Sequence, residues 1–194
     1  MTSRPTTPQF TSSPMIILVV DLSGFAGKFR SHSDSEMAAF IDRYYRLAGE
    51  VIEEHGGKII KCMGDGVLSI FPADAASETV AAATTMQRAV AELSLDAGLD
   101  CKLGANIHFG EAIAAEFGTG PSRRFDVIGR TVNQTFLLGR GTGIRLSERM
   151  YRKLPSDERA PWDKRKPPAV YVLGDSAEPY TALGKSPTRN ALRW

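Results

Sequence analysis

The sequence predicts an α+β fold of the ferredoxin-like type, in which βαββαβ order builds an antiparallel sheet with the long helices on one face and C-terminal additions. The length of 194 residues, with 42% hydrophobic and 24% charged residues, suits one well-buried domain. Short β-branched runs and two long segments of helical period follow each other in that order. Two of the short runs meet at an Asp-Gly turn, which is typical of a β-hairpin.

The hydrophobic pattern places the elements in turn. The first strand is expected at 15–22, and a helix from Asp34 to about His55 has apolar residues at 3.6-residue spacing. A hairpin at 58–62 and 67–71 and an alanine-rich helix from 73 to about 93 come next. The remaining expected elements are strands at 102–109 and 112–116, a turn at 118–122, a short segment FDVI, a helix at 130–138, a short helix from Ser147, and strands at 170–173 and 180–183.

Composition sets the domain limits and excludes several classes of function. Residues 1–14 are rich in Thr, Ser and Pro and predict a disordered tail, followed by one domain at 15–184 and a C-terminal tail at 185–194. The run MIILVV is too short to cross a membrane, and a net charge of +2 argues against a nucleic-acid partner. Cys62 and Cys101 lack metal-ligand spacing, so we expect buried thiols in a cytoplasmic protein.

Charge is divided unevenly along the chain. Residues 121–194 carry 15 Lys and Arg against 7 Asp and Glu, whereas residues 1–120 carry 9 against 15. The two halves can meet across a site for a metal and an anion, or the basic part can be a solvated face.

The turn Gly64-Asp65-Gly66 has two interpretations. It can be a plain hairpin turn, because Gly accepts positive φ and Asp bonds its own backbone. In a ferredoxin-like sheet, however, the end of the first strand can lie beside this hairpin, which brings Asp21 towards Asp65. Paired carboxylates suit magnesium, and the small residues at 23–27 let backbone N–H groups approach a triphosphate.

Four segments extend this hypothesis: VVDLSGFAG, HGGKIIKCMGDGVLSIF, NIHFGEAIAAEFG and RRFDVIGRTVN. In their order and spacing the sequence resembles the class III nucleotidyl cyclase catalytic domain, the adenylate and guanylate cyclase family. The resemblance implies that ATP is converted to 3′,5′-cyclic AMP and pyrophosphate by two Mg²⁺ ions per site, with Mn²⁺ as a substitute. It also implies a head-to-tail homodimer with the site at its interface.

The resemblance assigns roles to residues that match the family motifs. The metal ligands implied are Asp21, Asp65 and the backbone carbonyl of Leu22. The phosphates are expected near the amides of Gly24 and Phe25. Lys61 and Asp126 match the pair that selects adenine, and Asn133 matches the asparagine that orients the ribose and the transition state.

The sequence departs from the family at two positions. Leu137 stands where the family has its transition-state arginine, and Arg140 can replace it if the helix continues that far. Asp175 stands near the expected phosphate-binding lysine, for which Arg123, Arg124 or Lys185 can substitute. Two functions therefore stay open: an adenylate cyclase of low activity, or a degenerate domain that binds nucleotide or a partner with little turnover.

Overall fold

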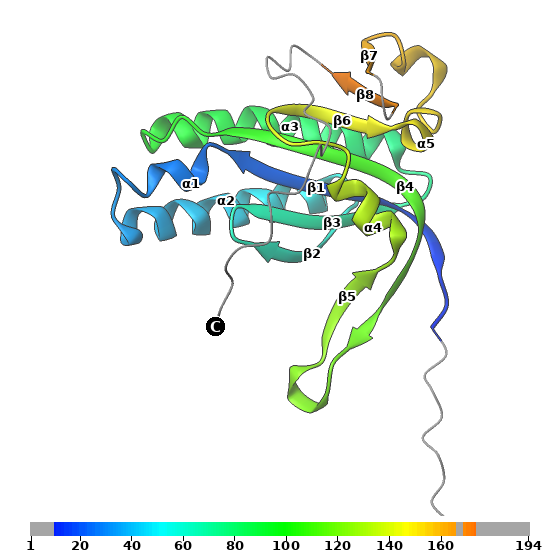
Figure 1. The fold of residues 1–194 in the computed structure, drawn as a ribbon, viewed down its shortest axis with the longest axis horizontal. Coiled ribbons are helices and arrows are strands. Elements are labelled where there is room, and N and C mark those ends of the chain that lie inside the picture. Colours follow the sequence, from blue (N-terminus) through cyan, green and yellow to red (C-terminus); the bar gives the residue numbers. More distant parts are fainter. Residues whose placement is uncertain (1–9, 166–168, 174–194) are drawn as a thin grey trace, which may run out of the picture.

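A computed structural model describes residues 10–165 and 169–173, and it contains the predicted ferredoxin-like core (Figure 1). The six core elements are β1 (Ser13–Ser23), α2 (Asp34–Glu54), β2 (Lys58–Met63), β3 (Gly66–Pro72), α3 (Ala76–Asp96) and β4 (Lys102–Phe117). A short helix, α1 (Phe25–Lys28), lies between β1 and α2. The additions are η1 (Gly120–Ser122), β5 (Arg124–Ile128), α4 (Arg130–Phe136), β6 (Gly143–Ser147), α5 (Glu148–Tyr151), η2 (Ser156–Glu158), β7 (Trp162–Arg165) and β8 (Val170–Leu173).

The strands form a sheet in the order β2-β3-β1-β4-β6-β8-β7, and β5 pairs with the far part of β4. The predicted α+β fold is thus confirmed. Among the described strands, β4 and β6 form the one parallel pair, with Asn106 opposite Arg145. The central strand β1 is antiparallel to both neighbours, and Asp21 lies opposite Gly66 on β3 and Gly104 on β4. This register places the carboxylate end of β1 beside the β2–β3 turn.

Alternation along β1 separates the two faces of the sheet. Ile16, Leu18 and Val20 pack with residues of α2 and α3 in the larger core cluster. Met15, Ile17 and Val19 pack on the opposite face with Val132 of α4. Both long helices therefore cover one face as predicted, whereas the shorter α4 crosses the other face (Figure 1).

Close packing at one glycine fixes α4 on β4. A Cβ atom built at Gly110 would lie 2.6 Å from Oγ1 of Thr131, so a side chain there would push the helix away. The same Thr131 hydroxyl donates a hydrogen bond of 2.5 Å to the carbonyl oxygen of Glu111. The first turn of α4 is therefore anchored, while its last turn leads towards the pocket described below.

Several boundaries differ from the prediction. β1 begins at Ser13, and β4 is one continuous strand where two were expected, because its far half turns away to pair with β5. β6 and β7 were not predicted, and α4 ends at Phe136 rather than at Leu138. Cys101 is buried but Cys62 is exposed, contrary to the expectation, since β2 is an edge strand. The strand expected at 180–183 lies outside the described residues.

The β4–β5 hairpin extends away from the main sheet (Figure 1). Phe10 stacks on Phe117 near its end, with ring centroids 5.3 Å apart.

Across the described residues, no helix combines the length and the apolar character needed to span a bilayer.

Candidate active site

Two aspartates come together at one end of the sheet. Asp21 is near the end of β1, and Asp65 is in the turn between β2 and β3. The backbone N–H of Leu22 donates to the carbonyl oxygen of Asp65 at 3.2 Å, which ties the turn to β1. The predicted pair is therefore adjacent, with the backbone of Leu22 between them.

The electrostatics of this end fit a cation site. Desolvation raises the pKa of the Asp21 carboxyl, the negative charge of Asp65 raises it further, and the guanidinium of Arg140 acts in the opposite direction. Two carboxylates that repel each other gain from a divalent cation placed between them. No cluster of three or more His, Cys, Asp or Glu suited to a metal occurs in the described part of the chain, so any such ion needs further oxygen ligands.

A tyrosine on α2 supports the turn that carries Asp65. The hydroxyl of Tyr45 donates to the carbonyl oxygen of Gly64 at 2.5 Å, and Gly64 has a φ of 65°, which favours glycine. The adjacent Tyr44 hydroxyl is buried without a hydrogen-bond partner among the described residues.

Tyr45→Phe should lower the free energy of unfolding by about 0.5–1.5 kcal/mol, the usual net contribution of one hydrogen bond. The matched control is Tyr44→Phe, which should leave stability unchanged or raised because it removes an unsatisfied buried hydroxyl. Urea denaturation of the two variants and the parent measures the difference. Equal stability of parent and Tyr45→Phe would contradict the turn-supporting role.

The segment after Asp21 leads directly into α1. Gly24 precedes this helix with a φ of 85°, a left-handed conformation that disfavours other residues. Phe25 is buried and stacks on Phe40 of α2, with centroids 6.0 Å apart. The Phe25 ring therefore fixes the backbone at 24–25 next to the aspartates.

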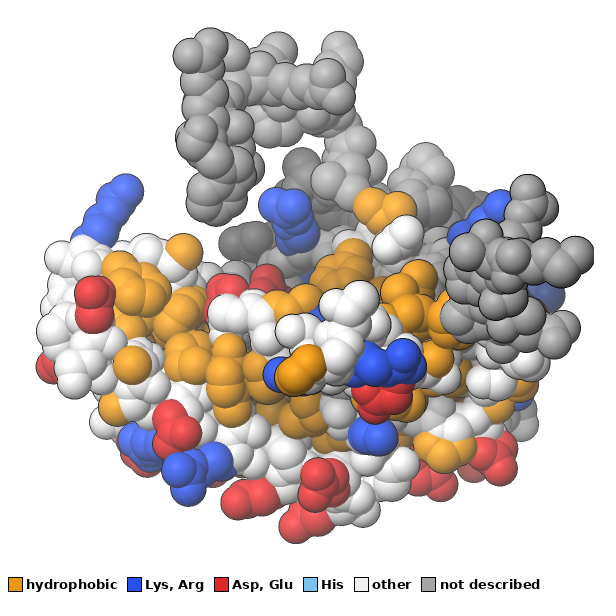
Figure 2. Space-filling model, turned by 90° about the horizontal axis from the view of Figure 1, so that it is seen from below, with side chains coloured by type: hydrophobic (Ala, Val, Ile, Leu, Met, Phe, Trp, Pro, Cys, Tyr) orange, Lys and Arg blue, Asp and Glu red, His pale blue; other side chains and the backbone are white. Residues whose placement is uncertain are grey.

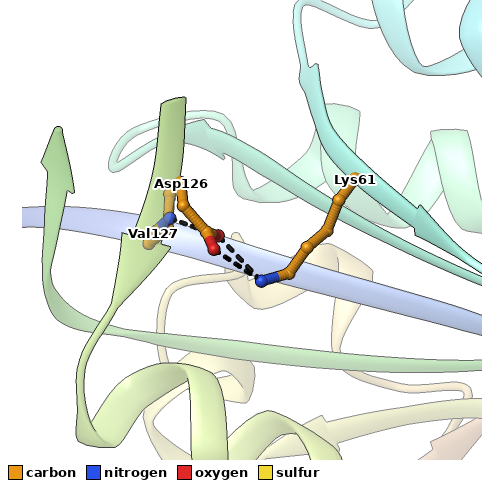
Figure 3. A network of polar contacts seen from close by, with 3 residues as sticks. All are labelled: Lys61, Asp126 and Val127. Atoms are coloured by element: carbon orange, nitrogen blue, oxygen red, sulfur yellow. Dashed lines mark hydrogen bonds and ion pairs between the residues drawn. The ribbon is translucent and has the colours of Figure 1, made fainter. Parts of the chain in front are cut away.

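Lys61 on β2 and Asp126 on β5 form an ion pair (Figure 3). The ammonium of Lys61 lies 2.9 Å from Oδ1 and 2.7 Å from Oδ2 of Asp126, and the N–H of Val127 donates to Oδ1 at 2.7 Å. Burial alone would raise the pKa of Asp126, but the hydrogen bonds from Lys61 and Val127 and the charge of Lys61 lower it overall. The structure thus joins two residues that are 65 positions apart.

A pocket of about 570 Å³ opens beside Asp21. One wall is the sheet, with Asp21, Gly104 and Asn106, and the other is the end of α4 and the following loop, with Leu137 and Arg140. The prediction that Arg140 approaches from a continued helix is wrong, because α4 ends at Phe136 and Arg140 lies in the loop. Arg140 nevertheless reaches the pocket.

Two predicted residues lie elsewhere. Asn133 is exposed on α4, and among the described residues it is not part of the pocket wall. Arg123 is at the far end of the β4–β5 hairpin, where its guanidinium donates to the carbonyl oxygen of Glu116 at 2.9 Å. Within one chain the structure therefore groups the aspartates with Arg140, and Lys61 with Asp126.

Sequence reasoning missed two polar residues of the pocket wall, Asn106 and Arg145. Both are largely buried, with 8% and 4% of their surface exposed. The available signal was a single polar residue inside each apolar strand run, GANIHF and GIRLS. A buried arginine needs hydrogen-bond acceptors, and such a residue points to a polar surrounding.

The profile of the family described as "Adenylate and Guanylate cyclase catalytic domain" matches residues 9–180. The chain belongs to this family. Its cyclase domain is similar to an adenylate cyclase of Mycobacterium tuberculosis, with 29% identity over 154 residues, 73% of this chain and 33% of the relative. An uncharacterised protein of the same organism is 25% identical over 119 residues, which are 61% of this chain and 21% of that protein. The chain thus spans a third or less of these relatives.

Solved structures share the fold of this cyclase domain. The guanylyl cyclase Cya2 is 25% identical with a TM-score of 0.75, and the match covers 89% of this chain and 99% of that one. The adenylyl cyclase CyaB from P. aeruginosa is 18% identical with a TM-score of 0.76, and the match covers 91% and 100%. One structure is a guanylyl and the other an adenylyl cyclase, so the base preference of this domain has to be argued from its own residues.

Proposed function

We propose that this domain converts ATP to 3′,5′-cyclic AMP and pyrophosphate, with divalent cations at Asp21 and Asp65. The observation that carries the proposal is the Lys61–Asp126 pair, which presents one hydrogen-bond donor and one acceptor on neighbouring elements. Adenine offers an acceptor at N1 and a donor at N6, so Lys61 and Asp126 match its edge. Guanine offers the reverse pattern, because N1 carries a hydrogen and O6 accepts.

Base binding requires the pair to open. Lys61 and Asp126 satisfy each other in this structure, and a bound adenine would exchange that contact for one bond to each residue. The exchange keeps both charged groups hydrogen-bonded, whereas guanine would leave a donor facing a donor. Selectivity would then come from the unfavourable pairing of the wrong base.

The residues at the end of β1 fit a cation and a triphosphate. Asp21, Asp65 and the Leu22 carbonyl supply the oxygen donors that Mg²⁺ prefers, and Mn²⁺ accepts the same ligands. When bound, such ions lower the pKa of the ribose 3′-hydroxyl and neutralise charge on the phosphates. The amides of Gly24 and Phe25 follow directly after β1, at the same end of the sheet as Asp21, and can bind phosphate oxygens.

The proposed reaction is an in-line displacement at the α-phosphorus. The ribose 3′-hydroxyl gives its proton to solvent water and its oxygen bonds to the α-phosphorus, while the bond from that phosphorus to the bridging oxygen breaks and pyrophosphate leaves with the electron pair. Asp21 and Asp65 would hold the divalent cations at the reacting end of the nucleotide, and Asn133 would orient the ribose. Positioning and charge stabilisation supply the rate.

A head-to-tail homodimer is part of the proposal. Met63, Phe136 and Leu137 line the pocket with exposed fractions of 37%, 42% and 54%. Figure 2 shows apolar side chains spread in a band over one face of the molecule. Exposed apolar surface of this kind indicates an interaction site. A partner placed there would bring its Lys61, Asp126 and Asn133 to the aspartates of this chain.

The experiment that tests the function is an assay of purified protein with ATP or GTP and Mn²⁺ or Mg²⁺, with the cyclic nucleotide and pyrophosphate measured separately. We expect cyclic AMP and pyrophosphate in equal amounts. Cyclic GMP as the main product would overturn the base assignment, and the absence of both products would overturn the reaction.

A second candidate is a degenerate domain that binds nucleotide or a partner with little turnover. It is favoured by Leu137, an apolar and half-exposed residue at the position that matches the family's transition-state arginine. Tight nucleotide binding without cyclic product would support this candidate.

Exchanging the charges of the base-selecting pair should change nucleotide preference. In the double variant Lys61→Glu with Asp126→Lys, the preference for ATP over GTP should fall by about 5- to 150-fold for each mispaired contact, equivalent to roughly 1–3 kcal/mol. The ratio of kcat/KM for the two nucleotides measures this. Lys58→Glu is the matched control, because Lys58 is on the same strand but lies over the Phe125 ring. An unchanged ratio in the double variant would remove the base-selecting role.

Mixing two inactive variants tests the shared site. Chains with Asp65→Ala and chains with Lys61→Ala should regain about a quarter of parental activity when mixed equally, since half of the dimers are mixed and each has one intact site. Chain exchange is followed by native mass spectrometry. Proven exchange without recovery would mean that Lys61 and Asp65 serve one site within a chain.

A further inference from the structure

Two side chains hold the loop at residues 139–142, which carries Arg140, against the sheet. The amide of Asn106 donates to the carbonyl oxygen of Gly139 at 2.9 Å. The guanidinium of Arg145 donates to the carbonyl oxygens of Arg140, Gly141 and Thr142 at 2.5, 3.2 and 2.6 Å. Four successive carbonyl groups are therefore bound, and we name Asn106 and Arg145 the loop clamp.

The loop clamp is built into the sheet. Asn106 on β4 and Arg145 on β6 are directly paired in the parallel register, so their side chains start from neighbouring positions of rigid strands. Arg145 is 4% exposed, and a buried guanidinium is tolerated only when acceptors surround it. The loop carbonyls supply three such acceptors, so the position of the loop contributes to the burial of Arg145.

A glycine brings the loop next to Asp21. Gly104 on β4 is the register partner of Asp21 on β1. A Cβ atom built at Gly104 would overlap the carbonyl oxygen of Gly141, so the loop rests directly on the strand position beside Asp21. Asp21, Gly104 and Arg140 accordingly line one pocket.

We infer that Arg140 serves the site built on the aspartates of its own chain, where the loop clamp positions it. The inference rests on the proposed function and adds to it, because the site would take Lys61 and Asp126 from one chain but Arg140 from the other. Neither Lys61 nor Asp126 is among the described residues that line the Asp21 pocket. The 139–142 loop thus supplies from within the chain the positive charge that Leu137, the residue directly after α4, cannot supply.

Two mixtures of variants distinguish the two possible arrangements, in which Arg140 serves the site of its own chain or the site of the partner chain. With Arg140 serving its own chain, Asp65→Ala mixed with Arg140→Ala should give no recovery, since in every mixed dimer one site lacks Asp65 and the other lacks Arg140. Lys61→Ala mixed with Arg140→Ala should recover about a quarter of parental activity, because one site then keeps all three residues.

The reverse pattern overturns the inference. Recovery of activity in the mixture of Asp65→Ala with Arg140→Ala would mean that Arg140 reaches the partner's site. This conclusion does not depend on which chain's site Lys61 serves. The mixture of Asp65→Ala with Lys61→Ala is the control for the proposed dimer. If the parent is active but this control mixture recovers no activity, the shared site is contradicted. The mixture of Asp65→Ala with Arg140→Ala then decides by itself which chain's site Arg140 serves.

The positioning role of the loop clamp can also be tested by a measurement that does not need enzyme activity. If the parent protein is inactive, the proposed function is refuted, but this test of the loop clamp still applies. Trypsin cuts after Arg140, and Arg145→Met or Asn106→Ala should speed this cleavage at least about ten-fold, because losing hydrogen bonds to a buried donor favours local opening. Cleavage at Arg123 should not change, and Arg152→Met, directly after α5, is the matched control. If Arg145→Met fails to fold, Asn106→Ala carries the test. Equal cleavage in parent and clamp variants would overturn the positioning role.

Discussion

Replacing Asp65 by Asn should reduce cyclic AMP formation by at least about 10²–10³-fold, because a lost metal ligand removes several kcal/mol of charge stabilisation. The free energy of unfolding should not fall. The charge of Asp65 raises the pKa of Asp21, so the two carboxylates repel each other without a cation and removing one relieves that repulsion. Activity and stability should therefore change in opposite directions.

Both readouts are needed to separate a metal ligand from a turn residue. Mn²⁺ should raise the Tm of the parent and have no such effect on Asp65→Asn, since a ligand stabilises only the state that binds it. Asp74→Asn is the matched control, because Asp74 is an exposed carboxylate that follows the other end of β3. Parental activity in Asp65→Asn, or an unchanged Mn²⁺ shift, would remove the metal assignment.

The proximity of Asp21 and Asp65 could be predicted from the sequence because it depends on topology. Once βαββαβ order is recognised, β1 must lie beside the β2–β3 hairpin, and an Asp-Gly turn places its carboxylate at that edge. The Lys61–Asp126 contact was less accessible. It depends on how β4 turns away from the main sheet to pair with β5, whereas the sequence pattern predicts two separate strands there.

The surroundings of Arg140 could not be predicted from periodicity. Helical spacing alone allowed α4 to continue to Leu138 and beyond, but the chain leaves the helix at Phe136 and turns through Gly139, Gly141 and Gly143. What holds this loop is a set of side chain to backbone hydrogen bonds from β4 and β6, two strands with 25 residues between them in the chain. Such long-range bonds leave no periodic trace, and only the isolated polar residues in two apolar strands indicate them.

The second large effect is expected at Arg140. Arg140→Ala should reduce kcat by about 10³–10⁵-fold, the range found for charge-stabilising arginines in phosphoryl transfer, with a much smaller change in KM for ATP. The reason is that its charge would act mainly on the transition state, in which negative charge grows on the phosphate oxygens. Arg130→Ala is the matched control, since Arg130 is an exposed arginine at the start of α4. Single-turnover kinetics at saturating Mn²⁺ and ATP measure the chemical step.

Leu137→Arg distinguishes two hypotheses: that Arg140 supplies the transition-state charge from the loop, or that the domain has no arginine for this role. If Arg140 supplies the positive charge from the loop, a second arginine at the pocket wall should add little to kcat, because the two guanidinium groups would repel each other in a shared pocket. In the Arg140→Ala background, the same substitution should restore part of the lost rate. A large gain in kcat from Leu137→Arg in the parent would show instead that the transition-state charge is absent. The domain would then be the second candidate, a nucleotide-binding domain with little turnover.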